Sequence, residues 1–163
     1  MMINPSLLIF AALLGVWFGA ALFYVAVAGP AAIAAGPSGV GFLQTLARRR
    51  GTGPFYAVLA FATVMAGIWM YVTSELYPSA SASNVWATLS LAFAILALSL
   101  GASANRIAER KWVKTVKHDQ TSTSADQDAE LVAAFFQAEK VNIMSTAVLG
   151  IALICLVLSR MLP

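Results

Sequence analysis

Long apolar stretches alternate with shorter polar ones along the 163-residue chain. A helix needs about 20 apolar residues to cross the hydrocarbon of a bilayer, and four stretches meet that length. They cover residues 6–28, 55–77, 84–104 and 141–162, and their apolar centres contain no Lys, Arg or Asp. The pattern predicts an all-α fold, in which residues 1–163 form one integral membrane domain built as a four-helix transmembrane bundle.

The polar stretch over residues 105–140 predicts a hairpin of two helical arms that extend the third and fourth spans into the cytoplasm. The first arm is basic and the second begins acidic, so antiparallel packing would bring Arg106 near Glu139 as an exposed and weak ion pair. An apolar seam between the arms would be provided by Trp112, Val116, Leu131, Phe135 and Phe136. The residues expected to contact the other arm, or anionic lipid headgroups instead, are Arg106, Arg110, Lys111, Lys114, Lys117 and Glu139.

The positions of Lys and Arg predict the orientation of the chain. All of them except Arg160 lie between the first and second spans or between the third and fourth. Connections rich in Lys and Arg stay in the cytoplasm. The chain is therefore expected in the cell inner (plasma) membrane as a multi-pass protein with both termini outside and the lipid bilayer as its surroundings.

The connection over residues 29–54 has two interpretations. A short helix over residues 37–47 could lie in the membrane interface, with its apolar side toward lipid or the bundle. The alternative is a re-entrant loop that lines a cavity, because the segment is rich in Gly and Pro, which break regular helix.

Composition narrows the function classes. Hydrophobic residues make up 60% of the chain and charged residues 10%, far from the balance of a soluble domain. The net charge of +3 does not indicate nucleic-acid binding, because topology already explains the basic residues. Cys155 is the single cysteine and His118 the single histidine. We therefore expect no cofactor, no metal site and no catalytic residues, since no carboxylate pair, nucleophile with base or His/Cys cluster is evident.

Small and polar residues within the spans suggest two kinds of site. Small residues at four-residue spacing allow close helix approach in lipid. The candidates for such packing are Gly15, Gly19, Ala62, Ala66, Gly67, Ala97 and Gly101. Trp17, Tyr24 and Asn142 could line a small central cavity; alternatively, Trp17 fills the core.

The run VAGPAAIAAGPSGVGFLQTLARRRGTGPFY, from Val27 to Tyr56, resembles the first connection of small four-span proteins of the copper-resistance-D-like and transmembrane-protein-205-like families. In those families a Gly-Pro ends the first span and a Pro-aromatic pair opens the second. The resemblance implies the four-span architecture. Glu139 stands near the place where members often carry a histidine, so the resemblance does not imply metal or haem in this chain.

These patterns favour a structural or accessory membrane subunit, in a homo-oligomer or a larger membrane complex, that associates through its helices. The alternative is a permease-like protein that moves a small solute or ion through a central cavity. A cofactor-dependent membrane enzyme comes third. Few polar groups lie within the spans, and transport of ions usually needs such groups at depth.

Overall fold

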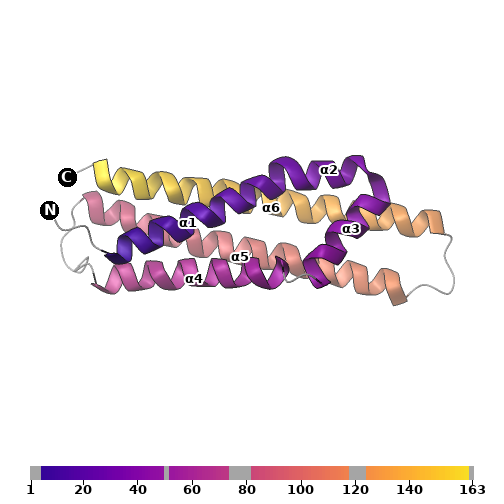
Figure 1. Ribbon diagram of the computed structural model, residues 1–163, viewed down its shortest axis with the longest axis horizontal. Helices are drawn as coiled ribbons and strands as arrows, with labels where there is room; N and C mark the ends of the chain where they lie inside the picture. Colours follow the sequence, from indigo (N-terminus) through magenta and orange to yellow (C-terminus); the bar gives the residue numbers. More distant parts are fainter. Residues whose placement is uncertain (1–4, 50–51, 74–81, 118–123, 162–163) are drawn as a thin grey trace.

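The computed structural model describes residues 5–49, 52–73, 82–117 and 124–161, and within them every residue except the turn residue Ala35 is helical (Figure 1). The elements are α1 (Pro5–Phe23), a π-helical turn η1 (Tyr24–Ala28), α2 (Gly29–Ala34), α3 (Gly36–Arg49), α4 (Thr52–Thr73), α5 (Ala82–Lys117) and α6 (Ser124–Met161). Four segments are long and apolar enough to cross a membrane: Pro5–Ala34, Pro54–Thr73, Ser83–Ser103 and Val132–Met161. The predictions of an all-α fold and of four helices long and apolar enough to cross a membrane are confirmed for the described residues.

The first apolar helix does not end at Ala28, where the sequence pattern placed its end. It continues through η1 into α2 and reaches Ala34. Pro30 has no N–H to donate, and a π turn is one of the local adjustments by which a membrane helix accommodates that loss. The chain turns at Ala35 and Gly36, and Gly36 has φ +68°, a conformation that favours glycine.

Helix α3 runs from this turn back across the bundle toward the start of α4 (Figure 1). The sharp turn also needs glycine at residue 39, because it brings α3 close to α2. A Cβ built on Gly39 would lie 2.6 Å from the carbonyl oxygen of Ala32. Residues 29–49 are thus helical on both sides of Ala35, so their glycines and prolines leave no irregular loop. The helix expected over residues 37–47 is present within α3, and the irregular backbone expected of a re-entrant loop is absent from residues 29–49.

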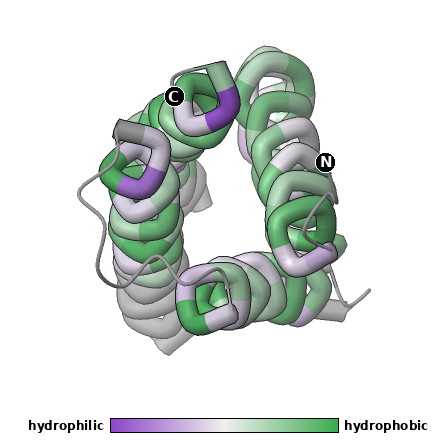
Figure 2. Tube along the Cα trace, turned by 90° about the vertical axis from the view of Figure 1, so that its left-hand side faces the viewer, coloured by the Kyte–Doolittle hydropathy of each residue, from purple (hydrophilic) through white to green (hydrophobic). Residues whose placement is uncertain are grey.

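The other three long helices form the body of the bundle with α1. Helices α5 and α6 pack along each other, and α1 packs against α4 and α6. Viewed from the end that holds both termini, the four rods are coloured apolar around most of their circumference (Figure 2). Helices that are apolar all round suit a position where one side meets the bundle and the other meets lipid.

The largest core side chains with no exposed surface are Phe10 and Leu14 from α1 and Leu149 from α6. A Cβ built on Gly67 of α4 would lie 2.9 Å from Cε2 of Phe10 and 2.6 Å from Cδ1 of Leu91. The helices α1, α4 and α5 therefore meet closely at Gly67.

Hydroxyl groups join the helices where side chains are small. Three donate to a main-chain carbonyl of a neighbouring helix and two share a bond with each other. These bonds are Ser145 Oγ to Ala97 O (2.9 Å), Ser83 Oγ to Ser159 O (2.8 Å), the Tyr56 hydroxyl to Ala20 O (3.0 Å), and Ser6 Oγ with Thr73 Oγ1 (3.1 Å). Such bonds stabilise helix pairs in lipid by about 0.6 kcal/mol on average, so they align the helices more than they hold them together.

Helices α5 and α6 are longer than a membrane crossing requires. With 36 and 38 residues, they extend about 54 and 57 Å at 1.5 Å per residue, whereas the hydrocarbon is about 30 Å thick. They project beyond α4 at the end opposite both termini (Figure 1). Both helices therefore continue as helix beyond the apolar segments Ser83–Ser103 and Val132–Met161.

Candidate functional site

A buried carboxyl group lies where α6 meets α2. Glu139 is only 6% exposed, although it lies within the membrane-spanning segment Val132–Met161. Phe135, one turn earlier on the same helix face, is buried against Ala32 of α2 and Val40 of α3. This small apolar cluster packs one face of α6 against α2 and α3. Because Glu139 lies on the same face, it is buried too.

The carboxyl group packs directly on the main chain of Gly29. A Cβ built on Gly29 would lie 2.8 Å from Cδ and 3.1 Å from Oε2 of Glu139, and closer still to Oε1. Any side chain at residue 29 would need the carboxyl group to move. Glycine at this position is what lets Glu139 approach the main chain so closely.

The helix that carries Gly29 has a broken hydrogen-bond pattern at this point. Within η1 the Gly29 N–H donates to the carbonyl of Tyr24, five residues back. The next residue, Pro30, has no N–H, so it donates neither to Val25 in the π pattern nor to Ala26 in the α pattern. Helix carbonyls point along the axis toward the following turn, so these oxygens are directed toward the turn that holds Gly29.

Two polar side chains lie near Glu139, one from α6 itself and one from η1. Asn142 lies one turn further along α6 and its side chain interacts with the carboxyl group, but the two side chains do not meet the distance and angle of a hydrogen bond. Tyr24 of η1 interacts electrostatically with Glu139 and with Tyr56 of α4. The Tyr56 hydroxyl is held by its bond to the Ala20 carbonyl. We call Tyr24, Gly29, Glu139 and Asn142 the Glu139 site.

The Glu139 site lacks the partners that a buried acid needs. Neither Oε1 nor Oε2 of Glu139 has a hydrogen-bond partner among the described residues. The other buried side-chain atom of this kind in the described part of the chain is Ser90 Oγ, a neutral hydroxyl. Burying an unpaired ionised carboxylate costs far more free energy than burying a neutral hydroxyl. A ligand that supplies positive charge or a donor would remove that cost.

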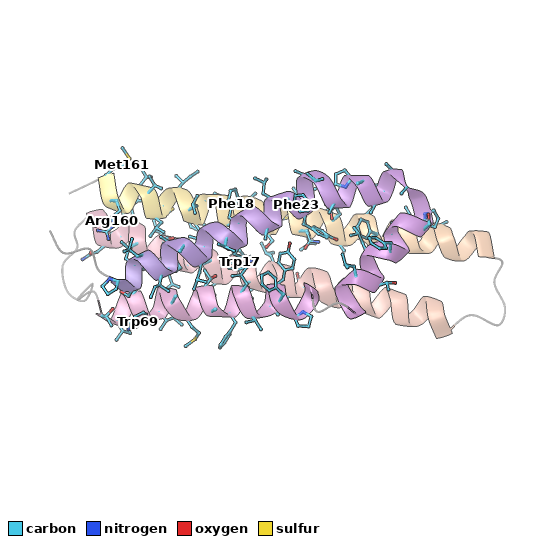
Figure 3. All side chains as sticks on the ribbon, in the orientation of Figure 1. Trp17, Phe18, Phe23, Trp69, Arg160 and Met161 are labelled. Carbon is cyan, nitrogen blue, oxygen red and sulfur yellow. The ribbon has the colours of Figure 1, made fainter. Side chains whose placement is uncertain are left out.

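The structure separates the three residues predicted to line a cavity. Tyr24 and Asn142 both lie near Glu139. Trp17 points from α1 into the bundle (Figure 3) and belongs to the apolar core with Phe10 and Leu14. Two of the three residues thus border a polar site, and the third fills the core.

The prediction that Glu139 is an exposed partner of Arg106 is wrong as regards exposure, because Glu139 is buried against Gly29. Phe135 packs against Ala32 of α2 and Val40 of α3, while Phe136 is 45% exposed. The side chains of Arg106, Arg110, Lys111, Trp112, Lys114 and Lys117 lie outside the described part of the structure, so their pairing stays a prediction.

Gly29 is not among the site residues predicted from the sequence. A Gly-Pro pair inside an apolar stretch is a signal of close approach and of a broken hydrogen-bond pattern. The sequence gives no spacing rule that links this pair to an acid more than a hundred residues later.

The small residues predicted to pack helices divide into two groups. In the first group, Ala66, Gly67 and Ala97 are buried and Ala62 is half-buried. Gly101 belongs with them, because a Cβ built on it would lie 3.7 Å from Ser145 Oγ, in ordinary contact. Gly15 and Gly19 differ, because a Cβ at either would meet nothing within 4 Å. Their face of α1 therefore turns away from the bundle.

Within residues 5–49, 52–73, 82–117 and 124–161, no three His, Cys, Asp or Glu side chains gather in a way that could hold a metal ion. Cys155 is buried as a free thiol. Comparison with protein-family models, with curated proteins and with solved structures finds no match for this chain.

Proposed function

We propose that this chain is a structural or accessory subunit of the bacterial inner membrane that associates through the outer face of α1. The occupant proposed for that face is a second copy of the chain, so the assembly is a homo-oligomer. The observation that carries the proposal is the open surroundings of Gly15 and Gly19, described above.

Glycine in a helix interior destabilises the helix by roughly 1 kcal/mol relative to alanine. Gly67 has an evident reason within the bundle, since Phe10 and Leu91 leave no space for a side chain. Gly15 and Gly19 have no such internal reason. Their spacing allows two helix backbones to approach closely in lipid, and the same face on a second copy is complementary to it by two-fold symmetry.

Replacement of Gly15 and Gly19 together by isoleucine should reduce association at least about tenfold, or about 1.4 kcal/mol. Branched side chains would hold the two backbones apart, while the open surroundings leave the fold intact. Energy transfer between donor- and acceptor-labelled protein in liposomes, measured over a range of protein-to-lipid ratios, reports the association. Ala147→Ile adds the same side chain at an exposed position of α6 and should leave association unchanged. A wild type that stays monomeric at every ratio would contradict the proposal.

The proposed orientation places both termini outside and the α5–α6 connection in the cytoplasm. Support comes from the positive-inside rule, applied to the Lys and Arg residues in residues 48–50 and 106–140. Both ends of the chain lie at one end of the bundle and the long arms at the other (Figure 1).

Single cysteines at Ser81 and Ser122 test the orientation in a Cys155→Ala background. Both positions lie outside the described residues. A membrane-impermeant thiol reagent should label the cysteine at residue 81 in intact cells and the cysteine at residue 122 only after the membrane is opened. The reverse pattern would overturn the orientation and leave the fold untouched.

The second candidate function is a permease-like protein for a small solute or ion. Glu139 favours it, because acids buried within membrane spans commonly mark ion or proton pathways. The two candidates use different surfaces, since Glu139 faces α2 and the Gly15–Gly19 face is turned outward.

A further inference from the structure

We propose that Glu139, together with the broken helix at Gly29 and Pro30, forms a binding site for one alkali cation. The site does not depend on lateral association, because it uses the inner contact between α6 and α2. Its ligands would be oxygen atoms from one side chain on α6 and from the main chain around η1.

The charge of the site fits a monovalent cation. Glu139 supplies one negative charge, and no His, Asp or second Glu completes a metal cluster with it among the described residues. Divalent cations are usually bound by more than one carboxylate or by a carboxylate together with phosphate groups. One carboxylate is neutralised by one monovalent ion.

The oxygen atoms of the site fit a hard cation. Glu139 brings two oxygens that have no hydrogen-bond partner among the described residues. Pro30 cannot donate to the carbonyls of Val25 and Ala26, so a cation can take the place of that donor. Carbonyls at the interruption of a membrane helix are known to coordinate Na⁺ in this way.

The close packing limits the size of the ligand. The carboxyl group lies against the Gly29 main chain with no space for even a methyl group at residue 29. Phe135, Ala32 and Val40 close the side toward the start of α6. An organic cation the size of choline is too large for this contact, so the proposed ligand is a small dehydrated ion.

Purified full-length protein tests the proposal with the cation alone as the probe. Thermal unfolding is measured at pH 8 in detergent while NaCl, KCl or LiCl replaces choline chloride at constant ionic strength. At ten times the dissociation constant of the preferred cation, binding should favour the folded state about tenfold. An increase in melting temperature with at least one alkali cation supports the site. No increase with any of the three overturns it.

Glu139→Gln removes the charge and keeps the shape. The variant should lose the cation effect and, in choline chloride, should be at least as stable as the wild type, because a neutral amide is less costly to bury than an unpaired carboxylate. Lys140→Gln changes the exposed neighbour on α6 and should keep the cation effect. A cation effect that persists unchanged in Glu139→Gln would overturn the proposal.

Gly29→Ala provides a second variant with the acid still present. Its Cβ would displace the carboxyl group from the main chain around η1. A carboxyl group is the free end of a flexible side chain, so the fold should survive. We expect the cation to bind about tenfold more weakly, which corresponds to 1.4 kcal/mol. Unchanged affinity in this folded variant would show that the main chain at Gly29 plays no part.

Discussion

Replacing Phe10 by alanine is expected to destabilise the bundle by roughly 2 kcal/mol. Phe10 has no exposed surface, and its ring lies against Gly67. In lipid the separated helices keep their apolar side chains in hydrocarbon, so the loss comes chiefly from the cavity and its missing contacts. A cavity of about 100 Å³ at about 24 cal/mol per Å³ gives that value.

Unfolding of the purified protein in mixed micelles with increasing dodecyl sulfate measures this loss. Phe61→Ala is the matched control, because Phe61 on α4 is 62% exposed and leaves no internal cavity. The control should change the free energy of unfolding by less than about 0.5 kcal/mol. Equal losses in the two variants would show that the region around Phe10 is not the core.

Replacing Gly67 by valine is expected to destabilise the bundle by about 1–3 kcal/mol through overpacking. A Cβ at this position already lies 2.6 Å from Leu91 Cδ1 and 2.9 Å from Phe10 Cε2, and valine adds two methyl groups beyond it. The helices α1 and α5 would have to move away from α4. The same unfolding measurement applies.

Gly41→Val is the control for this substitution, because nothing lies within 4 Å of a Cβ at Gly41. It should be nearly neutral. Leu91→Ala combined with Gly67→Val should recover part of the loss, since the smaller side chain makes room for the added methyl groups. A double variant whose loss is simply the sum of the two single losses would show that Gly67 and Leu91 do not touch.

The four membrane-spanning helices could be predicted from the sequence because the bilayer imposes a length on each apolar stretch. That constraint is local, so it needs no knowledge of what a helix contacts. The end of the first helix could not be found this way. Gly29 and Pro30 normally mark a helix end, but the π turn at Tyr24–Ala28 carries the helix past them.

The burial of Glu139 could not be predicted because it depends on which side of α6 meets α2. The sequence places Glu139 beside Lys140 near the polar arms, where an exposed ion pair is the simpler expectation. The contact of Phe135 with Ala32 and Val40 instead turns this side of α6 toward α2, so Glu139 is buried. This contact joins residues about a hundred positions apart in the sequence. The same holds for Gly15 and Gly19. Their spacing predicts a face for helix packing, but not whether that face turns toward the bundle or away from it.

The π turn also sets the rotational phase of everything that follows it in the first span. One extra residue in a turn rotates the next segment by roughly 100° relative to an uninterrupted α-helix. With η1 in place, Gly29 is the residue that faces the carboxyl group of Glu139. If Tyr24–Ala28 wound as an ordinary α turn, Ala28 would take the angular place of Gly29, and α3 would leave the span in another direction. The π turn at Tyr24–Ala28 therefore sets the rotation of α2 about the helix axis, and that rotation decides which atoms of α2 reach α6.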